Sequence, residues 1–187
     1  MNQEAYITAK KILIISTSAR KNSNSDILAD AFMNGAKNAG NEVEKVSLAE
    51  KQIAFCRGCF GCLKLGRCVI KDDAPEITER MAEADVIVWA TPIYYYEMSG
   101  QMKTMIDRAN ALFTKDYKFR DIYFLSTAAG EEEDCDERAI HGLEGWIACY
   151  PKSRLAGKVF AGGVNDAGAI KGHKALQEAY AMGRGIL

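Results

Sequence analysis

The sequence predicts an α/β fold in which helices cover both faces of a five-stranded parallel sheet, in strand order 2-1-3-4-5. Short apolar runs alternate with segments of helical periodicity, which is typical of strand–helix–strand units with right-handed crossovers. Polar loops follow the first and third runs, where ligands bind in such sheets. The 187 residues are 48% hydrophobic and 26% charged, as in ordinary folded domains. We therefore expect one three-layer domain over residues 1–187.

Five segments have the pattern of strands. Four are short apolar runs typical of buried strands, and the second alternates apolar and polar residues. They span residues 11–15, 42–48, 85–90, 121–126 and 158–162.

Helical periodicity fills the intervals between these strands. Gly40 is a natural stop for the first helix, and the acidic residues and early proline of Asp72-Asp73-Ala74-Pro75 favour a helix start. The predicted helices span residues 25–40, 72–83, 101–112, 131–149 and 171–183.

The charge balance argues against a nucleic-acid partner. The chain has 24 Lys and Arg against 25 Asp and Glu, a net charge of −1, whereas binding to phosphate backbones needs a basic excess. We also expect no membrane segment, because no apolar stretch approaches the ~20 residues of a spanning helix. The N-terminus lacks the pattern of a secretory leader, so we expect a cytoplasmic location.

The loop after the first strand is rich in hydrogen-bond donors. Residues 16–25, STSARKNSNS, join a buried strand to a helix, and a helix N-terminus stabilises an anion. Hydroxyls and Arg20 would complete a phosphate site, although the serines alone could simply cap the helix. Neither a Walker-type triphosphate motif nor the usual dinucleotide fingerprint is present.

The loop after the third strand, TPIYYYEMSG, holds three consecutive tyrosines. Neighbouring side chains point in different directions, so at least one tyrosine must face a ligand, a partner or solvent. Either a flat aromatic ligand or an oligomer contact would suit this loop.

A compact cysteine motif lies between the second strand and the second helix. Cys56, Cys59, Cys62 and Cys68 form a C-x2-C-x2-C-x5-C pattern, and four thiolates on one segment suit a cubane iron-sulfur cluster. Free thiols and zinc are the alternatives, although structural zinc more often uses two separated C-x2-C pairs. We expect Cys135 and Cys149 to be packing residues.

Three spans together resemble the flavodoxin-like NADPH-dependent FMN reductase family, and in particular its iron-sulfur flavoprotein branch. They are STSARKNSNSDILA, ADVIVWATPIYYYEMSGQMKTMIDR and GVNDAGAIKGHKALQEAYAMG. The resemblance implies a flavodoxin-like fold with non-covalently bound FMN, and a Cys-rich insertion at about residues 54–71 that holds a 4Fe-4S cluster near the flavin.

The resemblance also assigns roles to particular residues. The FMN phosphate would be held by Ser18, Arg20, Asn24 and Ser25, with Ser16 and Asn22 nearby. The isoalloxazine ring would be lined by Pro92, Ile93, Tyr94, Tyr95 and Tyr96, Ser99 would open the next helix, and Thr127, Ala128, Ala129 and Gly130 would meet the flavin edge. Ala19 stands where the family usually has proline.

The predicted function is that of an FMN-dependent oxidoreductase, with NAD(P)H or a ferredoxin-like protein as electron donor. The flavin carries the chemistry, so no side chain is nominated as catalytic. The alternative is a non-enzymatic flavodoxin-like electron carrier. The resemblance further implies a homodimer or homotetramer, and the acidic run Glu131-Glu132-Glu133-Asp134 is either a helix start or a docking site for a basic redox partner.

Overall fold

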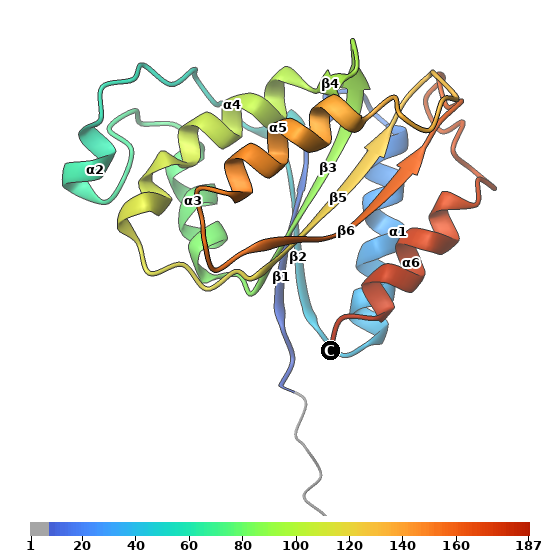
Figure 1. Ribbon diagram of the computed structural model, residues 1–187, viewed down its shortest axis with the longest axis horizontal. Helices are drawn as coiled ribbons and strands as arrows, with labels where there is room; N and C mark the ends of the chain where they lie inside the picture. The colour runs from blue at the N-terminus through green and yellow to red at the C-terminus, as the bar shows by residue number, and fades with distance from the viewer. Residues whose placement is uncertain (1–7) are drawn as a thin grey trace, which may run out of the picture.

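The computed structural model describes residues 8–187 and arranges them as a sheet between two layers of helices (Figure 1). The strands are β1 (Lys11–Ser16), β2 (Glu42–Ser47), β3 (Val86–Tyr94), β4 (Glu97–Met98), β5 (Asp121–Thr127) and β6 (Arg154–Ala161). The helices are α1 (Asn24–Asn38), α2 (Gly61–Leu65), α3 (Ala74–Glu83), α4 (Gly100–Arg108), α5 (Glu137–Ile147) and α6 (Ala175–Arg184), with 3-10 turns η1 (Leu48–Glu50) and η2 (Ala109–Thr114).

The main strands are parallel and follow the order β2-β1-β3-β5-β6, which is the order that the sequence predicts. The predicted count of five is wrong, because the sheet has a sixth strand, the two-residue β4. It pairs antiparallel with the end of β3, where Ile93 faces Met98 and Tyr94 faces Glu97. Residues 91–98, expected to be a loop, therefore form a β-hairpin.

Alternation along β1 sorts the core into two halves. Ile12 and Ile14 belong to the cluster that α1 and α6 cover, whereas Leu13 and Ile15 belong to the cluster beneath α3, α4 and α5. Successive strand residues point to opposite faces, so an apolar run of this kind must be covered on both. The three predicted layers are thus confirmed.

Helices α1 and α6 approach each other closely enough for backbone contact, as Figure 1 shows for the blue and red helices. A Cβ atom on Gly183 would lie 2.2 Å from the carbonyl oxygen of Phe32, and one on Gly35 would lie 2.0 Å from that of Tyr180. Only glycine permits this spacing at both positions.

Several predicted boundaries differ from the structure. The helix expected to start at Glu131 begins at Glu137, and the one expected at Lys171 begins at Ala175. The last strand starts at Arg154 rather than Lys158, and the helix predicted to reach Leu112 becomes a 3-10 turn after Arg108. The Cys-rich segment contains the short helix α2, where the sequence predicts no helix.

Within residues 8–187, no helix is long and apolar enough to cross a membrane. The expectation about an N-terminal leader concerns mainly residues 1–7, which lie outside the described part of the chain.

Candidate functional site

A cavity of about 160 Å³ opens at the carboxyl ends of β1, β3 and β5. Parallel strands bring the loops that follow them to one edge of the sheet, which places the predicted phosphate and ring loops side by side. The cavity is lined by Ser18, Arg20, Ser23, Asn24, Ser25, Pro92, Ile93, Tyr94, Thr127, Ala128, Ala129, Val164 and Asn165.

The N-terminus of α1 forms the floor of the polar half. The Ser23 hydroxyl caps the helix by accepting a hydrogen bond from the Asp26 N–H at 3.1 Å, and it lies 3.5 Å from the Ser25 hydroxyl. Ser18 and Ser25 are both buried. Free N–H groups and the helix dipole at this end stabilise an anion, so the cradle fits a phosphate.

The Asn24 side chain lines the cavity, but its hydrogen bonds are made with the protein backbone. Its amide N–H groups donate to the carbonyls of Val164 and Asp166, each at 2.9 Å, and its oxygen accepts from the Ile170 N–H at 3.2 Å. Asn24 therefore anchors the β6–α6 loop to α1, and its side chain has no further N–H group to donate to a phosphate.

Arg20 lies on the exposed rim and also contacts the β6–α6 loop. Its Nη1 donates to the Asn165 carbonyl oxygen at 2.8 Å. Sequence reasoning assigned no role to Val164 or Asn165, although they follow the carboxyl end of a predicted strand, the signal that located the other loops.

Other predicted site residues lie outside the cavity. Ser99 is fully buried, caps α4 by accepting from the Met102 N–H at 3.3 Å, and contacts the Thr17 hydroxyl at 2.9 Å. The buried hydroxyl of Ser16 has no hydrogen-bond partner among the described residues. Asn22 is exposed, with φ of 52°. Ser99 thus opens α4, as the sequence predicts, and joins the ends of β1 and β3.

Gly130 is also outside the cavity lining. A Cβ atom there would lie 2.6 Å from the Cys135 sulfur, and its carbonyl oxygen accepts a hydrogen bond from the Gly163 N–H at 2.9 Å. Gly130 therefore packs against Cys135 and Gly163.

The three tyrosines lie in three different environments. Tyr94 lines the cavity, Tyr95 is 97% exposed at the hairpin tip, and the Arg138 guanidinium lies 5.6 Å from the ring centre of Tyr96. Tyr95 and Tyr96 have φ of 51° and 66°, the left-handed pair of a type I′ turn. Asn-Gly usually fills such turns, since this conformation costs other residues about 1–2 kcal/mol each.

All four cysteines of the compact motif line a second cavity, of about 430 Å³. Ile106, Phe113, Trp146 and Tyr150 provide an apolar and aromatic wall. Cys149, predicted to be a packing residue, is instead exposed at this cavity, whereas Cys135 is buried. Across residues 8–187 no three Cys, His, Asp or Glu side chains lie close enough to form a ready metal group. The all-thiolate donor set and shared cavity nevertheless fit an iron-sulfur cluster.

A buried ion pair closes the base of the Cys-rich segment. Arg108, whose side chain is 0% exposed, donates to both carboxylate oxygens of Asp72 at 2.6 and 2.8 Å. Burial opposes the charge of each group. Their mutual hydrogen bonds, helped by the N–H groups of Ala54 and Ala74 on Asp72, hold the pKa of Arg108 above and that of Asp72 below its ordinary value.

The fold agrees with the comparisons to known proteins. Residues 10–154 match the family of NADPH-dependent FMN reductases. This chain belongs to that family. An iron-sulfur flavoprotein of Archaeoglobus fulgidus is 43% identical over 91 residues, which are 49% of this chain and 41% of that protein.

One further relative and one solved structure align over most of the chain. An iron-sulfur flavoprotein of Methanosarcina thermophila is 28% identical over 92% of this chain and 87% of its own length. The NAD(P)H:quinone oxidoreductase of Methanothermobacter marburgensis has the same flavodoxin-like fold, with a TM-score of 0.73 and 18% identity over 95% and 96% of the two chains.

Proposed function

We propose that this family member is an FMN-dependent NAD(P)H oxidoreductase built as one FMN-binding domain. The observation that carries the proposal is the cavity at the carboxyl edge of the sheet, where the helix N-terminus and serine hydroxyls adjoin the Tyr94 and Thr127 loops. FMN would supply the redox chemistry, accepting a hydride or single electrons.

The residues of the cavity would bind and orient the flavin. Ser18, Ser25, Arg20 and the α1 N-terminus would hold the phosphate, while residues 92–94 and 127–129 would border the ring. Among the described residues, the side chains that line this cavity are hydroxyls, amides, one guanidinium and apolar groups.

The Cys-rich segment is proposed to hold a 4Fe-4S cluster on Cys56, Cys59, Cys62 and Cys68. Supporting it are the cavity that all four line and the iron-sulfur flavoproteins among the relatives. Such a cluster would pass single electrons to or from the flavin, so a ferredoxin-like partner is a candidate donor or acceptor alongside NAD(P)H.

Assembly into a homodimer or homotetramer, and a cytoplasmic location, stay predictions. The exposed tyrosines at the hairpin support assembly, because large exposed aromatic side chains commonly mark contact surfaces.

One preparation tests the proposal. Protein purified without oxygen should show flavin absorption, a broad iron-sulfur shoulder and about one FMN per chain, and should oxidise NADPH with a quinone acceptor. Bound FMN without NAD(P)H turnover, together with rapid electron exchange with a ferredoxin, would favour the electron carrier. Colourless protein that does not bind added FMN would contradict both functions.

A further inference from the structure

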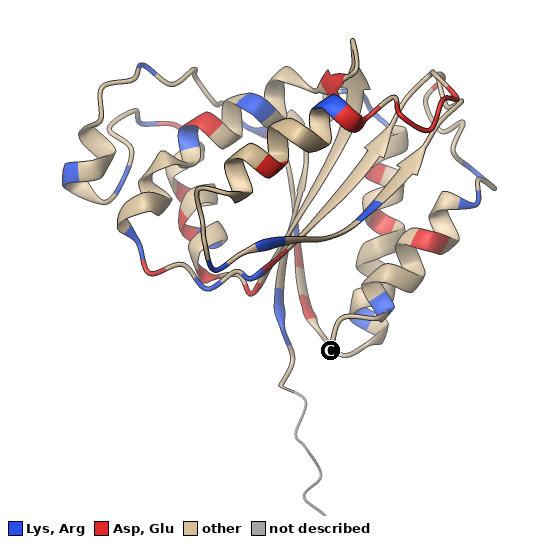
Figure 2. Ribbon diagram, viewed as in Figure 1, with Lys and Arg blue, Asp and Glu red and all other residues tan. Residues whose placement is uncertain are grey.

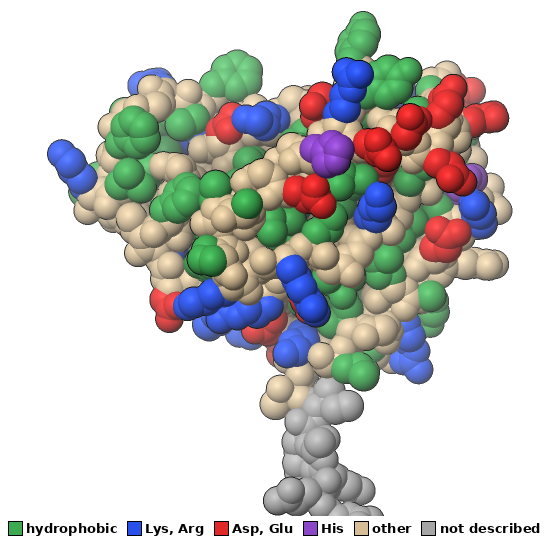
Figure 3. All heavy atoms as spheres, in the orientation of Figure 1, with side chains coloured by type: hydrophobic (Ala, Val, Ile, Leu, Met, Phe, Trp, Pro, Cys, Tyr) green, Lys and Arg blue, Asp and Glu red, His purple; other side chains and the backbone are tan. Residues whose placement is uncertain are grey.

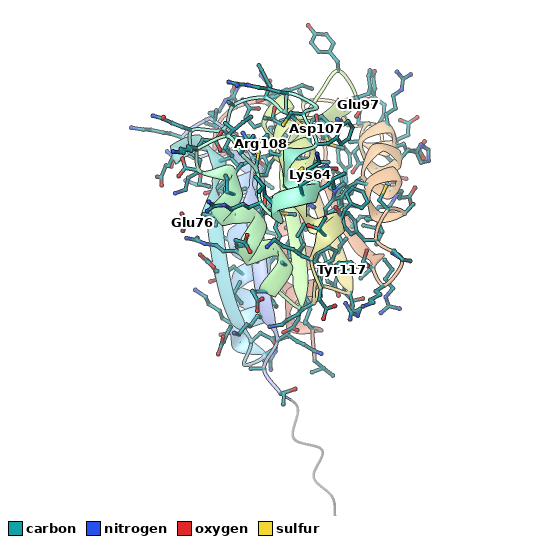
Figure 4. All side chains as sticks on the ribbon, turned by 90° about the vertical axis from the view of Figure 1, so that its left-hand side faces the viewer. Lys64, Glu76, Glu97, Asp107, Arg108 and Tyr117 are labelled. Atoms are coloured by element: carbon teal, nitrogen blue, oxygen red, sulfur yellow. The ribbon has the colours of Figure 1, made fainter. Side chains whose placement is uncertain are left out.

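Two side chains from outside the Cys-rich segment donate hydrogen bonds to its sulfurs. Arg108 Nη2 lies 3.4 Å from the Cys68 sulfur, and Asn110 Nδ2 lies 3.3 Å from the Cys62 sulfur. Arg108 ends α4 and Asn110 lies in the 3-10 turn that follows, against which α2 packs. Figure 4 shows Arg108 near the segment of α2 that carries Lys64.

Arg108 is held in this position from both ends of the segment. Its Nη1 donates to the Ala54 carbonyl oxygen at 2.6 Å, before the cysteines, while Asp72 binds it after them. Asp72 in turn accepts from the Ala54 N–H at 2.9 Å and the Ala74 N–H at 3.1 Å. A guanidinium fixed in this way presents its remaining N–H groups at defined positions.

Two polar features do not fit a purely structural role. The buried Nε of Arg108 has no hydrogen-bond partner among the described residues, and Arg108 is one of the residues around the cysteine cavity. Among the described residues, the side-chain amide of Asn110 donates its hydrogen bond to the Cys62 sulfur. Thiols accept hydrogen bonds weakly, whereas thiolates bound to metal carry negative charge and accept them well.

We propose that Arg108 and Asn110 are positioning residues of the cluster, which donate hydrogen bonds to the ligand sulfurs of Cys68 and Cys62 and raise its reduction potential. This rests on the proposed function, in which these cysteines bind iron. Reduction adds negative charge to the cluster, so N–H donors aimed at its sulfurs stabilise the reduced form more than the oxidised form.

The test uses the full-length protein, purified and reconstituted without oxygen. Asn110→Ala removes one sulfur contact without changing charge, and Arg108→Lys keeps the charge but loses the fork that joins Asp72 to Cys68. Iron content, the midpoint potential of the cluster in an electron paramagnetic resonance titration, and the rate of iron loss to a chelator are measured for each variant.

Both variants are expected to shift the midpoint potential of the cluster to more negative values and to lose iron about tenfold faster than wild type. Lys103→Gln is the matched control. This exposed cation on α4 pairs with Asp107 at 2.7 Å, so the variant should leave both quantities unchanged.

These measurements distinguish the positioning role of Arg108 and Asn110 from the presence of the cluster and from FMN binding. Wild type with iron, together with Asn110→Ala of unchanged potential and iron loss, overturns the positioning role while the cluster stands. Wild type with FMN but with zinc or no metal overturns the cluster and the inference with it. If Arg108→Lys does not fold, Asn110→Ala decides alone.

Discussion

At the scale of single residues, two side chains in one cavity have different tasks. Asn24 and Ser25 are adjacent, buried and both in the cavity lining. The side-chain amide of Asn24 donates hydrogen bonds to backbone carbonyls of the β6–α6 loop, whereas the Ser25 hydroxyl contacts the Ser23 hydroxyl at the helix N-terminus. Asn24 thus helps to build the cavity, whereas its neighbour Ser25 is the residue that we propose binds the phosphate.

Substitution should expose this difference. Asn24→Ala is expected to lower the free energy of unfolding by about 2–3 kcal/mol, since it removes three hydrogen bonds of about 1 kcal/mol each. Ser25→Ala should leave the stability of the apoprotein nearly unchanged but weaken FMN binding about tenfold, by removing a phosphate donor. Urea denaturation and flavin-fluorescence titration measure the two effects. Equal stability losses would contradict the division of tasks.

A second prediction at this scale concerns the Arg108–Asp72 pair. The pKa of Asp72 is lowered in the folded protein, so its contribution to stability is complete above its unfolded pKa and is lost as pH falls below about 4. At pH 7, Asp72→Asn should cost about 3 kcal/mol, because Arg108 is left buried without its charge partner. The difference between wild type and variant should shrink in urea titrations at pH 3. If the stability difference between wild type and Asp72→Asn were the same at pH 7 and pH 3, the stabilising role of the Asp72 carboxylate would be contradicted.

At the scale of elements, two glycine positions in helices predict opposite outcomes. Gly183→Ala should destabilise by about 3 kcal/mol, because its Cβ would collide with the Phe32 carbonyl oxygen where α6 meets α1. Gly145→Ala in α5 has no heavy atom within 4 Å of the new Cβ and should stabilise by about 0.5–1 kcal/mol through helix propensity. Thermal unfolding of the two variants measures both changes in stability. Equal changes for Gly183→Ala and Gly145→Ala would contradict the close contact between α1 and α6.

The hairpin at the end of β3 supports another prediction. Replacing Tyr95-Tyr96 with Asn-Gly should raise the free energy of unfolding by about 1–2 kcal/mol, because those residues adopt the type I′ turn readily. Tyr95→Ala is the control, since it removes the ring but relieves no backbone conformation. A double variant no more stable than the control would argue against the left-handed turn.

The elements also show what sequence can and cannot predict. The parallel strands follow from apolar runs that alternate with helical segments. Their order is favoured by the polar, phosphate-friendly loop after the first strand, and the cavity follows from the loops at the carboxyl ends of the strands. The hairpin was missed because Tyr-Tyr violates the usual preference of its turn. The helix start at Glu131 was wrong because residues 131–136 instead bring Asp136 to the buried Ser126 hydroxyl. The Arg108 contacts join residues 36 and 40 positions apart, beyond any local pattern.

At the scale of the whole molecule, charge gathers at one edge of the sheet. The loop between β5 and α5 carries exposed Glu131, Glu132, Glu133 and Asp134, and Figures 2 and 3 show acidic groups concentrated there. This loop begins where Thr127 and Ala129 line the proposed flavin cavity. A basic redox partner would therefore be steered toward the flavin.

Neutralising Glu131 and Glu133 to Gln should slow electron exchange with a basic protein partner several-fold at low ionic strength, with the difference vanishing at high salt. The control neutralises Glu42, which begins β2, and Asp116, which lies in the segment between η2 and β5; both precede the amino ends of strands or start them, on the edge opposite the cavity. Stopped-flow kinetics at two salt concentrations gives the comparison. If both variants slow electron exchange equally, the net charge of the protein accounts for the change, and docking at the acidic loop is contradicted.

The anchoring of Arg108 has a consequence for engineering. Ala54 and Asp72 both bind one guanidinium, so the two ends of the cysteine-bearing stretch meet within a few ångströms of each other. The stretch therefore leaves and rejoins the domain at nearly the same point, and a short glycine bridge from residue 54 to residue 72 would be long enough to replace it.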